Sequence, residues 1–161
     1  MTPIRINWVK MKNVQRIHQR LYALGLGPLI GRIILLLTTI GRKTSQKRVT
    51  PVQYEVIDGD YYIGAARGVK ADWFRNIQAN PSVEVHVKSL HFKGHAEAIT
   101  NQKRIADFLG YRLRTHPLMI GLMMKMHDLP MRPSRAQLEE LAGTLALVII
   151  HPTEASKEML G

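Results

Sequence analysis

Residues 49–66 have the sequence VTPVQYEVIDGDYYIGAA, in which two runs rich in branched and aromatic side chains flank an Asp-Gly-Asp turn. Residues 49–57 alternate between two faces, which is the period of a half-buried β-strand. An Asp-Gly pair favours a tight hairpin turn, so residues 61–66 are expected to form the returning strand. The stretch therefore predicts a β-hairpin.

Further strands are expected on both sides of this hairpin. An apolar run covers residues 33–39, valines alternate with polar residues at 83–87, and residues 91–99 return across a short turn. Residues 145–150 are a last apolar run that could close the sheet. Six mostly antiparallel strands without βαβ alternation predict a mainly β fold with flanking helices, of the α+β class. A small barrel would remove the exposed sheet edges.

Helical periodicity or capping sequences occur at the start, in the middle and near the end of the chain. Asp72 is a candidate cap for the middle helix, which Asn80-Pro81 ends. In chain order the predicted helices cover residues 12–24, 71–80, 101–116 and 117–127, followed by one between the capping box at 134–137 and Gly143.

The length of 161 residues favours one domain. We expect an N-terminal helical extension (1–28), barrel strands that bind a cofactor (33–99), a helical segment (101–143) and a closing strand (144–152). The absence of cysteine excludes disulfides and thiolate metal sites. No secretory signal or membrane-spanning run is evident, so a cytoplasmic protein is expected.

The net charge of +11 suggests an anionic partner: nucleic acid, an acidic membrane or a phosphorylated small molecule. A solvated basic surface without a partner is the alternative. An aromatic fraction of 6% disfavours nucleic acid, whose binding usually pairs basic residues with exposed aromatic rings. The basic helix at residues 12–24 could contact an anionic membrane, although packing on the domain is the commoner role of such a helix.

The densest charge lies at residues 41–48, Gly-Arg-Lys-Thr-Ser-Gln-Lys-Arg, between two predicted strands. Four cations, two hydroxyl groups and a glycine in one turn are the groups that bind phosphate. The spacing is not that of a P-loop, because an arginine follows Gly41 where that motif has lysine. A second segment, residues 64–76, places small residues and a glycine loop before a helix, where a planar ring could approach the backbone.

Together the two segments, with the helix ending at Asn80-Pro81, resemble the deazaflavin-dependent nitroreductase family. The resemblance runs from about Ile33 to Lys88. It implies a split β-barrel that binds coenzyme F420, a phosphorylated deazaflavin with a glutamate-rich tail. It also implies hydride transfer to an apolar electrophile such as a quinone, a nitroaromatic or an activated alkene.

The resemblance also assigns roles to individual residues. Arg42, Lys43 and Arg48 would hold the phosphate and acidic tail. Pro51, Ala65 and Ala66 would line the ring, and Trp73 and Asn76 would close the site. The full set of expected cofactor-binding residues is Arg42, Lys43, Thr44, Lys47, Arg48, Val49, Pro51, Ala65, Ala66, Arg67, Gly68, Asp72, Trp73 and Asn76.

The substrate side departs from the family pattern. The best-known nitroreducing member has tyrosine at the Gln53 position and a serine–lysine pair at Arg67-Gly68, so nitroreduction itself is in doubt. Tyr54 and Tyr111 are candidate proton donors by residue type alone. Gln53 is expected on the substrate side. A flexible apolar wall for the substrate is expected from Tyr111, Met119, Met123, Met124 and Met126, with ordinary core packing as the alternative.

Other functions stay open at this stage. The same barrel could use FMN as its cofactor, or the chain could be a non-catalytic barrel that binds nucleic acid or an anionic membrane. His86, His91 and His95 could share a hairpin face, but no supporting motif accompanies them, and no metal site is expected.

Overall fold

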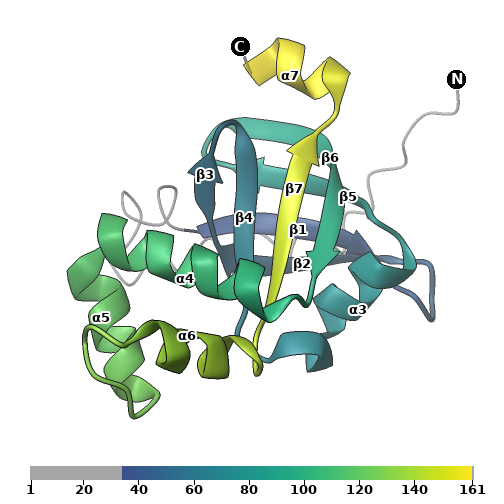
Figure 1. Ribbon diagram of the computed structural model, residues 1–161. Helices are drawn as coiled ribbons and strands as arrows, with labels where there is room; N and C mark the ends of the chain where they lie inside the picture. Colours follow the sequence, from purple (N-terminus) through teal and green to yellow (C-terminus); the bar gives the residue numbers. More distant parts are fainter. Residues whose placement is uncertain (1–33, 161) are drawn as a thin grey trace, which may run out of the picture.

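Residues 34–160, which the computed structural model describes, contain seven strands. They are β1 (Ile34–Ile40), β2 (Lys47–Gln53), β3 (Glu55–Ile57), β4 (Asp60–Ala65), β5 (Ser82–Val87), β6 (Leu90–Ile99) and β7 (Ala146–Pro152). All pair antiparallel in the order β2-β1-β5-β6-β7-β4-β3 (Figure 1). This confirms the expected antiparallel sheet with flanking helices. The helix predicted at residues 12–24 lies outside the described residues.

The prediction of six strands was wrong by one, because the run at residues 49–57 divides at Tyr54. The half before Tyr54 pairs with β1, and the half after it pairs with β4. These strands occupy opposite ends of the sheet order, yet a single residue joins them. The sheet therefore has to curl until its two edges meet at Tyr54, which makes it a barrel.

The barrel interior holds the first of two hydrophobic clusters. Alternate residues of β1, β4, β5 and β7 point inward, and Phe74 from the adjoining helix is fully buried against them. Val52, Tyr54 and Trp73 pack on this cluster while remaining partly exposed. Each fully buried aliphatic or aromatic side chain contributes about 1.5–3 kcal/mol to folding, so this cluster is a main source of stability.

A second cluster lies between the barrel and a layer of helices. The helices of the described chain are η1 (Gly68–Lys70), α3 (Asp72–Ala79), α4 (Gln102–Thr115), α5 (Pro117–Met126), α6 (Arg135–Ala142) and α7 (Glu154–Leu160). Figure 1 shows α4, α5 and α6 together on one side of the barrel. Leu147 and Ile149 face these helices, whereas Val148 and Ile150 face the barrel interior. Strand β7 is therefore buried on both faces.

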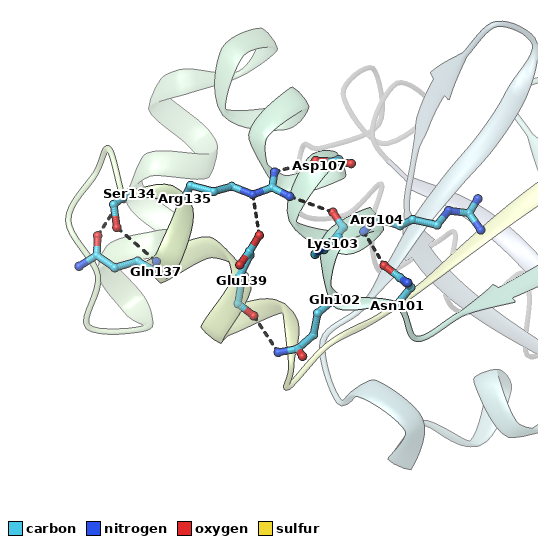
Figure 2. A network of polar contacts seen from close by, with 9 residues as sticks. All are labelled: Asn101, Gln102, Lys103, Arg104, Asp107, Ser134, Arg135, Gln137 and Glu139. Carbon is cyan, nitrogen blue, oxygen red and sulfur yellow. Dashed lines mark hydrogen bonds and ion pairs between the residues drawn. The ribbon is translucent and has the colours of Figure 1, made fainter.

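Arg135 fastens α6 to α4 (Figure 2). Its guanidinium contacts Asp107 at 2.6 Å and Glu139 at 3.0 Å, and it donates to the carbonyl oxygen of Lys103 at 3.3 Å. Exposed ion pairs of this kind stabilise little individually, but a network fixes the register of two packed helices. The predicted capping box is confirmed: Ser134 and Gln137 exchange side-chain to backbone hydrogen bonds at the start of α6.

Two local details differ from expectation. Ala71, not Asp72, is the N-cap of α3, and Asp72 is the first helical residue, where its charge still complements the helix dipole. The 3₁₀ turn η1 and the C-terminal helix α7 were not predicted, because neither leaves a distinct periodic pattern. Within residues 34–160, no helix combines the length and the apolar composition needed to cross a membrane.

Candidate functional site

The basic turn between β1 and β2 has a fixed backbone. The N–H of Gly41 donates to the carbonyl of Gln46 at 2.7 Å, and the N–H of Ser45 donates to the carbonyl of Gly41 at 2.8 Å. Ser45 adopts a left-handed conformation with φ of 57°, and the Thr44 hydroxyl accepts from the N–H of Gln46. Its cations therefore project from a rigid support.

Helix α3 holds this turn through Arg42. The backbone N–H of Arg42 and its guanidinium both donate to Oδ1 of Asn76, at 3.2 Å and 2.9 Å. The guanidinium also contacts Oδ1 of Asp72 at 3.1 Å. Asn76 is only 5% exposed, and its amide donates to the Thr39 hydroxyl at 3.3 Å. The two segments singled out in the sequence thus meet in the fold, with Arg42 as the connection.

This arrangement bears on the expected role of Arg42. Its side chain is 23% exposed and already contacts Asp72 and Asn76, so it orients the turn. The hydrogen bond and charge of Arg42, followed by the charges of Arg75 and Arg67, lower the pKa of Asp72. The ionised form of Asp72 is therefore favoured, and Arg42 is the arginine that contacts it directly.

Lys43 and Arg48 are the cations of the turn that remain available. Both are exposed, and within residues 34–160 neither side chain has an ion-pair or hydrogen-bond partner. Lys47, in contrast, contacts Glu84 at 2.9 Å. Burial acts to raise the pKa of Glu84, but the hydrogen bond and charge of Lys47 lower it overall. The turn therefore offers two uncompensated positive charges to an anion.

Helix α3, which holds the basic turn through Asn76, follows the loop at the end of β4. The side chain of Ala65 points into the barrel core and is 1% exposed, and its expected place beside a ligand stays a prediction from the sequence. Gly64, on β4, and Ala66, in the turn after β4, are both exposed. A Cβ at Gly64 would meet no atom within 4 Å. Gly64 and Ala66 are therefore small, exposed residues at which a flat ring could approach the backbone.

Gly68 is required by the backbone at the start of η1. Its φ is +59°, and a Cβ would lie 2.7 Å from the carbonyl oxygen of Thr144. We expect Gly68→Ala to lower the free energy of unfolding by about 2 kcal/mol or more, since the left-handed conformation and the backbone clash both cost stability. Urea unfolding measures this. Gly64→Ala is the matched control, and equal stability of the two variants would contradict the assignment.

Strand β2 carries the remaining expected cofactor contacts along one edge of the sheet. Val49, Pro51 and Gln53 share a face, and Pro51 and Gln53 are exposed. Pro51 lies three positions after Arg48 on the strand, a distance of about 10 Å along the backbone. Trp73, on α3, packs partly on the barrel core and edge-on against Phe74, so only part of its ring is open to a ligand.

The two candidate tyrosines occupy different parts of the molecule. Tyr54 lies at the barrel corner, where its ring is 5.7 Å from that of Tyr61. Burial, then the neighbouring Tyr61 and Glu55, raises the pKa of Tyr54, so it keeps its phenolic proton at neutral pH. Tyr111 is half-buried on α4 in the helical layer. Tyr54 follows Gln53 directly and is thus the nearer in sequence to the β2 edge.

The methionines expected to form a substrate wall are not gathered at the turn. Met124 is fully buried in the second cluster, Met123 packs against that cluster, and Met119 is 38% exposed. Figure 1 shows the β1–β2 loop beside α3, at the opposite end of the molecule from α5. Core packing, the alternative considered from the sequence, describes Met123 and Met124.

An ion cluster that sequence reasoning missed joins the barrel to the helical layer. Oε1 of Glu55 lies 3.5 Å from Nε of Arg112 and 2.7 Å from Nε2 of His116. The Arg112 side chain is 9% exposed, and its Nε has no hydrogen-bond partner among the described residues. Burial lowers the pKa of Arg112, and Glu55 opposes that shift. The one sign of this cluster in the sequence was Glu55, a charged residue within the half-buried strand predicted at residues 49–57.

The histidine hairpin forms a pair and no larger cluster. The rings of His86 and His91 stack with centroids 5.7 Å apart, and Nε2 of His91 is 3.7 Å from Glu84. In the described part of the chain, no group of three His, Cys, Asp or Glu side chains is arranged to hold a metal ion.

Comparison with known proteins bears directly on this geometry. The family model described as F420H2-dependent quinone reductase matches residues 10–118. A protein of Mycobacterium tuberculosis (strain ATCC 25618 / H37Rv) named F420H2-dependent quinone reductase is 40% identical over 87 residues, which are 48% of this chain and 57% of the relative. A protein of the same name from strain CDC 1551 / Oshkosh matches equally. The chain thus spans little more than half the length of these curated relatives.

Solved structures share the fold at low sequence identity. An F420-H2 dependent reductase superposes with a TM-score of 0.51 at 21% identity, covering 74% of this chain and 95% of that one. The heme storage protein HutZ from Vibrio cholerae gives a TM-score of 0.53 at 14% identity, covering 76% and 83%. These similarities show that the curled sheet is a split barrel.

Proposed function

Since the chain belongs to the F420H2-dependent quinone reductase family, we propose that it binds reduced coenzyme F420 and uses it to reduce a quinone. The observation that carries the proposal is the basic turn: it is held to α3 by Arg42 and presents Lys43 and Arg48 without acidic partners. A phosphorylated cofactor with an acidic tail needs such cations, because charge-assisted contacts to phosphate and carboxylate are the strongest polar contacts available.

The residues present fit this cofactor in two respects. Lys43 and Arg48 provide uncompensated positive charge, and no hydrogen bond within residues 34–160 uses the backbone N–H groups of Lys43 and Thr44. The second respect is side-chain volume, because the exposed residues Gly64 and Ala66 at the end of β4 are both small. A flat ring with an anionic tail requires both features.

We assign the roles of the chain's own groups as follows. Lys43 and Arg48 bind the phosphate and the tail, while Asn76 and Asp72 act through Arg42 and fix the turn. Pro51 and Ala66 border the ring, and Arg67 adds positive charge beside Asp72. Val49, Thr44, Lys47, Gly68 and Trp73 remain proposed neighbours of the cofactor.

When bound, the reduced deazaflavin supplies the hydride that reduces the quinone. The protein contributes binding, orientation and a proton. Tyr54 is the proposed donor of that proton, because it carries a phenolic hydroxyl and remains partly exposed at the barrel corner, next to the β2 edge. Contact between residues 12–24 and an anionic membrane, where lipophilic quinones reside, stays a prediction from the sequence.

A fluorescence titration of the full chain with F420 and with FMN tests the proposal. We expect F420 to bind at micromolar concentration or tighter and FMN to bind less tightly, since F420 carries more negative charge for the two cations. Affinity for F420 should fall as salt increases. Reduced F420 should then be oxidised by a quinone in the presence of the protein. Tighter binding of FMN would overturn the cofactor assignment, and binding of neither would overturn the function.

A further inference from the structure

Helix α5 is apolar on both of its faces. Ile120, Gly121 and Met124 are buried against the second cluster. On the opposite face Leu118 is 68% exposed, Leu122 is 51% exposed and Met126 is 85% exposed. These three residues are four positions apart and so lie on successive turns of one helix face. With Met119, which is 38% exposed, they form an exposed apolar surface, here termed the α5 surface.

The α5 surface is unlike other exposed apolar residues of the described chain. Val56, Val69 and Leu90 are also exposed, but they lie singly on β3, η1 and the start of β6. Isolated exposed hydrophobic residues are normal in soluble proteins, whereas a contiguous set marks a surface that contacts something else. A solvent-facing side of α5 would need no leucine or methionine.

Basic residues flank α5 along the chain and are here termed the basic border of the α5 surface. Arg114 precedes α5, Lys125 lies in its last turn, and Arg132 follows it, all three exposed. The one acidic residue between positions 114 and 132 is Asp128. The surface is therefore an apolar strip with a cationic border on a protein of net charge +11. That combination complements a bilayer surface containing anionic lipids.

We propose that the α5 surface docks on the surface of an anionic lipid bilayer. Leu118, Leu122 and Met126 enter the boundary between headgroups and acyl chains, and the basic border contacts the lipid headgroups. The ten residues of α5 are too few to span a bilayer, so the helix lies in the plane of the interface. A second copy of the chain fits less well, because a two-fold interface would bring two identical basic borders together.

The docking does not rest on the proposed enzymatic function, and its test uses no cofactor. The full chain is mixed with phosphatidylcholine vesicles with or without about one third phosphatidylglycerol, and bound protein is measured by flotation. We expect binding to the anionic vesicles at least tenfold stronger than to the neutral ones. L118Q/L122Q should weaken that binding at least tenfold, while V56Q/L90Q, which changes two exposed apolar residues elsewhere, should not change it.

A labelled variant reports the contact directly. The chain has no cysteine, so Leu122→Cys can carry a single environment-sensitive fluorophore. Its emission should shift to shorter wavelength on anionic vesicles, and the same label at Leu90→Cys should not shift. Vesicle binding that L118Q/L122Q leaves unchanged would overturn the proposal. So would a lipid-free dimer, seen by sedimentation, that the same variant dissociates.

Discussion

Alanine at both Lys43 and Arg48 is expected to weaken F420 binding about a hundredfold or more, with little change in the free energy of unfolding. Both side chains are exposed and have no partner in the described structure, so the fold loses no contact when they are removed. A hydrogen bond to a charged group contributes about 1.5–3 kcal/mol, and two such contacts correspond to a hundredfold or more in affinity. Cofactor fluorescence measures the affinity, and urea unfolding measures the stability.

The matched control is K103A/R132A, which removes the same charge from exposed positions on α4 and between α5 and α6. A general electrostatic attraction would be weakened equally by both double variants, whereas a specific site responds only to the first. Equal losses would show that the turn does not hold the cofactor.

Arg42→Ala should behave differently from the variant of Lys43 and Arg48. It removes the contacts to Asp72 and Asn76 that hold the turn on α3, so stability should fall together with affinity. From the sequence alone, Arg42 and Lys43 carry the same expected role. The fold separates them, since one cation is bound to helix α3 and the other is free for a ligand.

Glu55→Ala is expected to have the largest effect on stability. It leaves the Arg112 guanidinium buried beside Phe108 without its counter-charge. Removing one partner of a buried ion pair costs about 3–5 kcal/mol, far more than loss of an exposed pair. Because Glu55 lies on β3 and Arg112 on α4, the loss should loosen the contact between the barrel and the helical layer. Urea or thermal unfolding measures the change.

A double-mutant cycle separates the ion pair from the packing of its members. Replacing both residues, as in E55A/R112M, should restore much of the stability, because no uncompensated charge remains buried. Glu140→Ala is the control for loss of a glutamate at an exposed site. A Glu55→Ala variant no less stable than Glu140→Ala would mean that the Arg112 charge is satisfied in another way.

The sequence predicted the local elements because their causes are local. Alternation at residues 83–87, the Asp-Gly turn at 58–60 and the capping box at 134–137 each concern neighbours within a few positions. The basic turn at residues 41–48 was likewise visible as charge density, and the resemblance in and around it identified the family.

The tertiary structure alone decided how these elements meet. Alternation continues through Tyr54, so periodicity could not show that the strand passes there from one sheet edge to the other. Contacts between residues more than thirty positions apart, such as Arg42 with Asn76, leave no periodic trace. The same holds for Met124, which composition could place beside a substrate but which is fully buried in the second cluster. Sequence periodicity shows which side chains of one strand or helix lie on the same face. Which residues of other elements they contact depends on how the barrel closes.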